Sequence, residues 1–144
     1  MKWINHELIS GAIMFSISSG NIIDTSFVLA GSVFPDWIEG RPTESNYNTW
    51  RKYHRGASHW LLMYCVLFIL SGLYITHTSS VLPRYMAIFT FGAILHIIED
   101  LLCGKVPVIS LKNKIGFKLF TVGSIEEYAL SFVLVYFVYL TMYE

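Results

Sequence analysis

The sequence predicts an all-α, polytopic integral membrane protein: a helical bundle with three full spans and a short N-terminal helical hairpin. Apolar residues make up 54% of the 144 residues, and only 14% are Asp, Glu, Lys or Arg. Soluble domains carry about a quarter charged residues, because their surfaces face water. Three segments are also apolar over the roughly 20 residues that a spanning helix needs. The length suits one domain, so we expect residues 1–144 to form a single membrane-embedded unit.

The N-terminal third predicts a hairpin of two short helices, Leu8–Ser19 and Ile22–Phe34. Each segment holds about a dozen residues, which is too few to cross a bilayer alone. The dipeptide Gly20-Asn21 between them is a turn signal. Asp24 follows directly, and we expect it at the N-cap or in the first turn of the second helix.

Three longer segments predict the spans, and they are Ala57–Ile75, Leu82–Cys103 and Ser124–Tyr143. The first has a single ionisable residue, at its very start, and the last carries its two glutamates in the first turn. The middle segment presents His96, Glu99 and Asp100 near its end. Ionisable groups at that depth are costly in hydrocarbon, so they usually face a cavity or a partner.

The order of these helices brings a set of polar residues to one membrane face. If the hairpin turns back, the first long segment leaves the face where the chain begins, the second returns to it and the third leaves again. The residues expected there are His6, Asp36, His54, His59, His96, Asp100 and Glu127. Nine of the ten Lys and Arg residues fall on this face and only Arg84 on the other. The positive-inside rule makes the face cytoplasmic, with the C-terminus on the opposite side.

Two histidine motifs and one aspartate could carry chemistry at that face. His96-Ile-Ile-Glu-Asp100 places an imidazole and a carboxylate on the same side of a helix. His54-Arg-Gly-Ala-Ser-His59 adds two histidines, and Asp36 projects from a fixed point because Pro35 is expected to end the preceding helix. Each feature alone has a plainer explanation, namely a polar patch between helices, interfacial histidines, or a loop or N-cap acid. Their convergence favours a shared site.

The set of ligands that these motifs offer suits a divalent metal. Nitrogen and oxygen ligands without thiolates favour Zn²⁺, or Mn²⁺ or Mg²⁺ where carboxylates dominate. A metal at that face would lower the pKa of its water and supply hydroxide near neutral pH. His77 lies beside the opposite face, and we expect it to be solvated.

The motifs also come in the order and rough spacing of a known family. They are Asn5-His6, Phe34-Pro35-Asp36, the His54–His59 and His96–Asp100 blocks, Gly104-Lys-Val-Pro107 and Gly123-Ser-Ile-Glu-Glu127. From about His6 to Glu127 the chain resembles the YdjM-like bacterial inner-membrane proteins, a family of metal-dependent hydrolases. It is also distantly similar to zinc-dependent bacterial phospholipase C, an all-helical phosphoesterase. The resemblance implies hydrolysis of a phosphoester in a lipid or amphiphile at the cytoplasmic face of the inner membrane.

The resemblance also implies roles for individual residues. The expected metal ligands are His6, Asp36, His54, His59, His96 and Asp100, and the expected catalytic residues are Asp36, Arg55, His59 and Glu127. Among these, Arg55 would bind a phosphate oxygen. The chain departs from the family pattern at three positions. Ile38 stands where relatives carry a second acid, with Glu39 next, Cys103 stands where they carry Thr, and Trp60 where they carry Ser.

Two other functions remain open from the sequence. A non-catalytic membrane regulator or assembly factor could use the same residues as a structural metal site or polar network. A small metal or ion carrier should show polar residues through the bilayer, and the segments starting at Ala57 and Ser124 show few. The expected partners are the lipid bilayer and an amphiphilic substrate, without nucleic acid, because the net charge is zero. The oligomeric state and the substrate are not specified.

Overall fold

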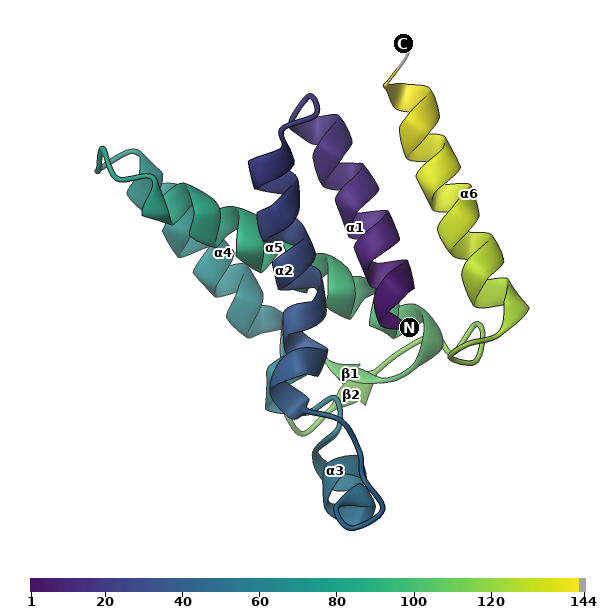
Figure 1. Ribbon diagram of the computed structural model, residues 1–144. Coiled ribbons are helices and arrows are strands. Elements are labelled where there is room, and N and C mark those ends of the chain that lie inside the picture. The colour runs from purple at the N-terminus through teal and green to yellow at the C-terminus, as the bar shows by residue number, and fades with distance from the viewer. Residues whose placement is uncertain (143–144) are drawn as a thin grey trace.

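The chain is mostly helical in the computed structural model, which describes residues 1–142 (Figure 1). The long helices are α1 (Trp3–Ile17), α2 (Ile22–Glu39), α4 (Leu61–Ile75), α5 (Leu82–Cys103) and α6 (Ile125–Thr141). Between them lie the short helix α3 (Tyr47–Tyr53), the 3-10 turn η1 (Ala57–His59) and an antiparallel pair of strands, β1 (Val106–Pro107) and β2 (Lys114–Ile115). The predicted helical class is therefore confirmed, with a small β ribbon that the sequence did not indicate.

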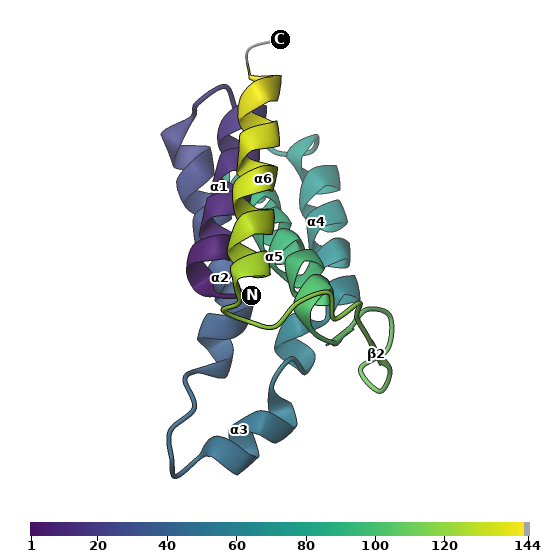
Figure 2. The same ribbon diagram turned by 90° about the vertical axis from the view of Figure 1, so that its right-hand side faces the viewer.

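Helix α5 is the centre of the packing, because both α2 and α4 lie against it. Helix α1 lies between α2 and α6. The turn between α1 and α2 and the far end of α6 lie at the top of Figure 1, whereas the N-terminus, α3 and the strands lie at the bottom. Figure 2 shows the same division from the side. The residues predicted to meet at one face therefore come from elements that do meet at one end of the bundle.

The N-terminal hairpin is present with longer helices than predicted, and Asp24 takes the second of its two expected positions, the first turn of α2. The side chain of Asn21 accepts hydrogen bonds from the backbone N–H groups of Ile23 and Asp24, at 3.0 and 3.2 Å, so Asn21 is the N-cap of α2. Asp24 lies in the first turn and pairs with Arg84 of α5. This ion pair joins α2 to α5 at the end of the bundle away from the polar residues.

The prediction that Pro35 ends a helix is wrong, because α2 continues through Pro35 to Glu39. Proline inside a helix costs about 3 kcal/mol through a lost hydrogen bond and a steric clash. Pro35 is buried, and tertiary packing of α2 along α5 outweighs that cost. Asp36 consequently lies on a helix, with Glu39 one turn later on the same side.

Two glycines allow α2 and α5 to approach closely. A Cβ atom on Gly31 of α2 would lie 1.9 Å from the carbonyl oxygen of Phe89, and one on Gly92 of α5 would lie 2.2 Å from that of Val28. Small residues at a helix crossing let two backbones meet in this way. The crossing lies one turn before Asp36 and His96, so it brings the polar parts of α2 and α5 face to face.

Two helices among residues 1–142 are long and apolar enough to cross a membrane, Tyr47–Ile75 and Leu82–Cys103. They correspond to the first two predicted spans, although the first begins earlier than expected because it includes α3 and η1. The third predicted span is not among them. Its described helix, Ile125–Thr141, has 17 residues, and the predicted end at Tyr143 lies outside the described residues.

Candidate metal centre

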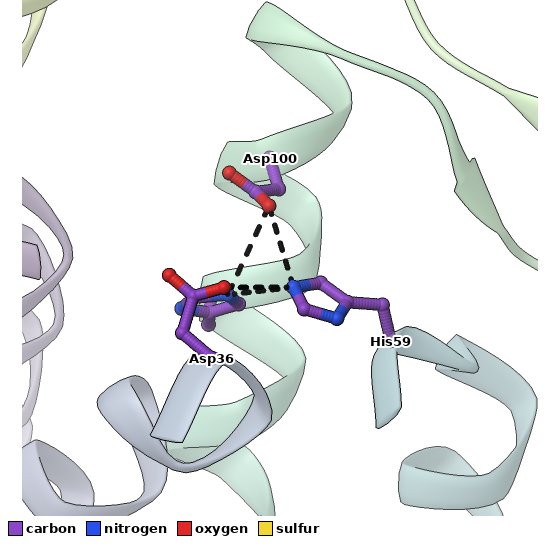
Figure 3. Close-up of side chains that lie close together, drawn as sticks. Asp36, His59 and Asp100 are labelled. Carbon is purple, nitrogen blue, oxygen red and sulfur yellow. Dashed lines mark hydrogen bonds and ion pairs between the residues drawn. The ribbon is translucent and has the colours of Figure 1, made fainter. Parts of the chain in front are cut away.

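Four side chains from three elements converge at the lower end of the bundle. Asp36 comes from α2, His59 from η1, and His96 and Asp100 from α5 (Figure 3). Each offers one ligand atom, and these four atoms all lie within 4.8 Å of one another. The two histidines and Asp100 are buried, whereas Asp36 is partly exposed. The group can therefore hold a metal ion and still be reached from outside.

The distances among the four ligand atoms fit a single ion. His59 Nε2 lies 3.2 Å from His96 Nε2, 3.3 Å from Asp36 Oδ1 and 3.5 Å from Asp100 Oδ2. His96 Nε2 lies 3.7 Å from Asp36 Oδ1 and 3.9 Å from Asp100 Oδ2. Zinc bonds to nitrogen and oxygen of about 2.0–2.2 Å place tetrahedral ligands about 3.3–3.6 Å apart. The five distances that involve a histidine are thus near tetrahedral values, and the Asp36 and Asp100 oxygens lie within 4.8 Å of each other.

Hydrogen bonds on the far side of each imidazole turn its Nε2 atom toward the cluster. His96 Nδ1 donates to the backbone carbonyl of Ser32 at 2.6 Å. His59 Nδ1 lies 2.9 Å from Glu39 Oε1 and donates a hydrogen bond to it. In the neutral imidazoles, protons on both Nδ1 atoms leave the lone pairs on Nε2. Such outer partners orient histidine ligands and raise their basicity in metal sites.

Asp36 turns one oxygen toward the cluster and uses the other elsewhere, whereas both oxygens of Asp100 contact Arg55. Asp36 Oδ2 accepts a hydrogen bond from Trp3 Nε1 at 2.9 Å. Asp100 Oδ1 accepts one from Arg55 Nη2 at 2.8 Å, and the Met1 ammonium group also contacts it. Arg55 Nε lies 2.8 Å from Asp100 Oδ2, so the guanidinium group contacts both carboxylate oxygens of Asp100.

The backbone around Arg55 is built to bring its side chain to Asp100. Arg55 has a positive φ of 53°, which is uncommon for a residue with a side chain and often marks a functional turn. A Cβ atom on Gly56 would lie 2.6 Å from the carbonyl oxygen of Tyr53, so only glycine fits the turn. A Cβ atom on Gly104 would lie 1.5 Å from Arg55 Nη1. Gly104 therefore makes room for the guanidinium group.

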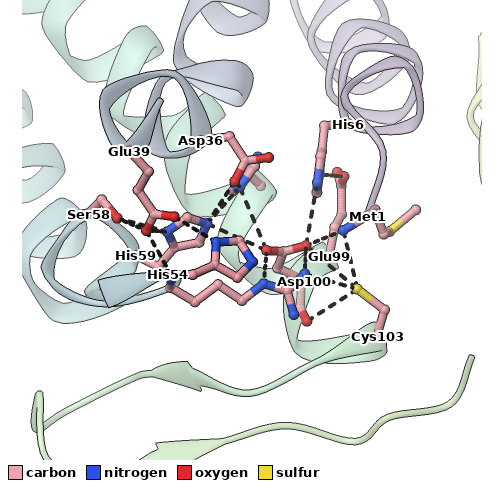
Figure 4. A network of polar contacts seen from close by, with 12 residues as sticks. Met1, His6, Asp36, Glu39, His54, Ser58, His59, Glu99, Asp100 and Cys103 are labelled. Atoms are coloured by element: carbon pink, nitrogen blue, oxygen red, sulfur yellow. Dashed lines mark hydrogen bonds and ion pairs between the residues drawn. The ribbon is translucent and has the colours of Figure 1, made fainter. Parts of the chain in front are cut away.

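Glu39 lies behind the histidines and joins several of them (Figure 4). It accepts hydrogen bonds from His54 Nδ1 at 2.7 Å, from the backbone N–H of Arg55 at 2.8 Å and from the Ser58 hydroxyl. Burial alone would raise the pKa of Glu39, but the hydrogen bonds from His54, His59 and Ser58 outweigh it and hold that pKa below its ordinary value. Glu39 is thus an ionised acceptor that fixes the histidines.

Three of the predicted site residues lie beside the four-residue group. His54 contacts Glu39 and is half-buried at the edge of the site. His6 stacks on His96 with ring centroids 3.9 Å apart and has its Nδ1 atom 2.6 Å from Glu99. The Glu127 carboxylate accepts hydrogen bonds at the start of α1 and of α6, from Lys2 N at 2.7 Å, from Gly123 N at 2.6 Å and from the Asn5 amide. Glu127 therefore joins two helices.

Sequence reasoning missed two residues that orient the group. Trp3 holds Asp36, and the carbonyl of Ser32 holds His96. For Ser32, helical spacing is a signal that could have found it, because Ser32 precedes Asp36 by four residues and thus lies on the same side of α2. Trp3 has no such signal, since its contact depends on how α1 packs against α2.

A cavity of about 530 Å³ leads from the outside to the group. Asp36 belongs both to the lining of this cavity and to the four ligands. Arg55 and His54 also line it, together with the basic residues Lys2 and Arg41. An anionic group entering the cavity would meet positive side chains immediately before the cluster.

A family model described as YdjM inner membrane protein matches residues 1–142, so the chain belongs to that family. No curated protein and no solved structure matches the chain. The chain is accordingly an inner membrane protein, and Tyr47–Ile75 and Leu82–Cys103 supply helices fit to cross the bilayer.

Proposed function

We propose that this member of the YdjM family is a membrane-embedded, metal-dependent hydrolase that cleaves a phosphoester in a lipid or another amphiphile. The observation that carries the proposal is the pair of Nε2 atoms of His59 and His96, 3.2 Å apart. Their lone pairs repel unless a proton or a cation lies between them. A carboxylate oxygen approaches each nitrogen as well, and four such ligands favour a divalent cation over a proton.

The charge of the site supports the same conclusion. Asp36, Glu39, Glu99 and Asp100 bring four carboxylates to a largely buried region. Arg55 and the Met1 ammonium group both contact Asp100. Buried charges are costly unless they are paired, and a divalent cation would compensate the remaining carboxylates. Asp36, His59, His96 and Asp100 would hold it, and two nitrogen with two oxygen ligands suit zinc, with manganese or magnesium as alternatives.

The residues around the cavity suit a phosphorylated substrate. When bound, a divalent cation supplies a water of lowered pKa and polarises a phosphoryl oxygen. Arg55 lies at the junction of the cavity and Asp100, where its guanidinium group can donate to a phosphate oxygen. Asp36 is the ligand nearest the cavity, and His59 is held by Glu39. Glu127 acts on the site indirectly, because it positions the start of α1.

The proposal is tested by measuring metal content and phosphate release from detergent-purified protein. We expect a divalent metal to copurify, and we expect release of phosphate or a phosphorylated headgroup from one of a panel of phospholipids and phosphorylated isoprenoids. A chelator should stop the release and added zinc or manganese should restore it. Metal-independent release would refute the proposal, as would the absence of release from a broad panel.

A non-catalytic role is the second candidate, and the contact of Arg55 with Asp100 favours it. This ion pair, together with the hydrogen bonds of Glu39, can stabilise the buried cluster as a polar network. A regulator or assembly factor would need only such a stabilising network and no catalytic turnover. Bound metal without turnover would support this candidate.

We also propose that the site faces the cytoplasm of a bacterial cell and that α6 is a third span. Nine basic residues belong to segments at the end of the bundle that carries the site, and Arg84 alone belongs to the other. The positive-inside rule then places the site on the cytoplasmic side. At 17 residues α6 is about 26 Å long, close to the hydrocarbon thickness of about 30 Å.

Reporter fusions test this orientation. A reporter inserted near Lys114 should give a cytoplasmic signal, and one fused to the C-terminus should give a periplasmic signal, because a single span separates the two positions. Alkaline phosphatase and a fluorescent protein are suitable reporters, since each is active on only one side. The same location for both fusions would refute the arrangement.

A further inference from the structure

A largely apolar groove of about 620 Å³ runs between α1, α2 and α6, with Glu7 near one end and Thr25 near the other. Helix α1 contributes Ile4, Leu8 and Phe15, which recur at helical spacing on one side. Helix α6 contributes Val135 and Val138 from the opposite wall. Any helix in a bilayer has apolar side chains toward lipid, but this surface differs because it is hollow.

Small residues on α1 form the floor of the groove. Gly11 and Ala12 lie midway along it, and Leu29 of α2 lies behind them. A Cβ atom on Gly11 would lie 3.1 Å from Leu29 Cδ2. A larger side chain at Gly11 would displace Leu29, and one at either position would narrow the groove, because Gly11, Ala12 and Leu29 all line it.

The groove is long enough for an acyl chain. From Ile4 to Phe15 an α-helix rises about 16 Å, at 1.5 Å per residue, which is about half of the roughly 30 Å hydrocarbon thickness. The groove runs from Ile4, at the end of the bundle that carries the site, to Thr25 and Met142 at the opposite end. A single acyl chain can thus lie along α1 from the site toward that end.

One end of the groove continues into the charged cavity at the candidate metal centre. Ile4 lines both of them. The charged cavity also carries Lys2, Arg41 and Arg55. Arg41 lies over the ring of Trp3, 5.5 Å from its centroid, and Trp3 holds Asp36. Three basic side chains therefore lie in the cavity that the groove reaches, together with the carboxylates of Asp36 and Glu39.

We infer that this groove binds an acyl chain of the substrate, a lipid whose phosphorylated headgroup lies in the charged cavity. The inference rests on the proposed function for the identity of the headgroup. It assigns Gly11 and Ala12 as the residues that set specificity for long chains, and Lys2 and Arg41 as residues that attract the anionic headgroup. The substrate class is thus an anionic glycerolipid or a similar phosphorylated amphiphile with at least one long chain.

The experiment compares binding of two non-hydrolysable phosphonate analogues of phosphatidic acid, one with oleoyl chains and one with butyryl chains, to metal-loaded protein in the same detergent. The wild-type protein should bind the oleoyl analogue at least about tenfold more tightly, because more methylene groups are buried. Gly11→Leu should lose this preference and keep its affinity for the butyryl analogue, which also shows that it folds. Ala12→Leu, one position further along the floor, should do the same.

Gly72→Leu is the matched control, because a Cβ atom there meets nothing within 4 Å and the residue is on α4. It should keep the wild-type preference. Two results would overturn the inference. One is an equal preference for the oleoyl analogue in Gly11→Leu, Ala12→Leu and wild type. The other is dissociation of a dimer by Gly11→Leu without loss of lipid binding, since the occupant of the groove would then be a second copy of the chain.

The outcomes also separate this inference from the proposed hydrolase. A chain-length preference that depends on the groove, without phosphate release, would uphold lipid binding in the groove and refute the hydrolase. Equal phosphate release from a long-chain lipid by Gly11→Leu and wild type would uphold the hydrolase and refute the role of the groove.

Discussion

Replacing His96 or Asp100 with alanine is expected to remove the bound metal, whereas replacing His77 with alanine should leave it in place. His96 and Asp100 present Nε2 and Oδ2 from one side of α5, with 3.9 Å between them. Loss of either leaves a three-ligand site, and loss of Asp100 also leaves Arg55 without its partner. We expect metal content to fall from about one ion per chain to a tenth or less, given that even indirect partners change metal affinity about 10–100-fold.

Elemental analysis of the purified variants measures this effect directly. His77 is the matched control, because it is exposed at the turn between α4 and α5 and shares no element with the cluster. Asp100→Asn keeps the size of the side chain, so it separates loss of a ligand from loss of folding. Equal metal content in all four proteins would contradict the assignment of these residues as ligands.

Sequence patterns predicted the helices, and all four residues of the candidate metal group were among the ligands expected from the sequence. The spacing of His96 and Asp100 already placed them on one side of a helix, and the Gly20-Asn21 signal marked the hairpin. What local patterns missed depends on contacts between helices. Pro35 was expected to end α2, yet packing on α5 carries the helix through it to Glu39. The partners that orient the ligands depend on the same contacts.

The departure at Ile38 has a different meaning once the helix is known. Ile38 is on α2 between Asp36 and Glu39, and its side chain is 56% exposed. Adjacent helical positions point about 100° apart, so Asp36 and Glu39 share a side that Ile38 does not. The four ligand atoms are assembled without an acid at this position. Its absence is therefore compatible with an intact metal site.

Glu39 illustrates why a site can be predicted in outline while its internal roles are not. It follows Ile38, the position at which relatives carry a second acid. The structure places its carboxylate against the Nδ1 atoms of His54 and His59, away from the Nε2 atom with which His59 faces the cluster. The conformation of the turn from His54 to His59 decides which ring nitrogen faces Glu39. The spacing of these residues along the chain does not predict that conformation.

Asp36→Asn is expected to lower phosphate release by at least about two orders of magnitude while the protein still folds and inserts. Asparagine keeps the size of the side chain and can still accept the hydrogen bond from Trp3 Nε1, which is 2.9 Å from Asp36 Oδ2 in the native chain. It removes the negative charge that faces His59 Nε2 at 3.3 Å. Asp36 is also the ligand that lines the charged cavity, so its charge bears on both the metal and the substrate.

The measurement is the initial rate of metal-dependent phosphate release, taken with metal content and thermal stability of the same preparation. Asp24→Asn is the control on the same helix, because Asp24 pairs with Arg84 at the opposite end of the bundle. It should keep nearly the full rate even if its melting temperature falls. If Asp36→Asn and Asp24→Asn release phosphate equally fast, the reaction does not use the cluster, and the non-catalytic network becomes the better account of these buried residues.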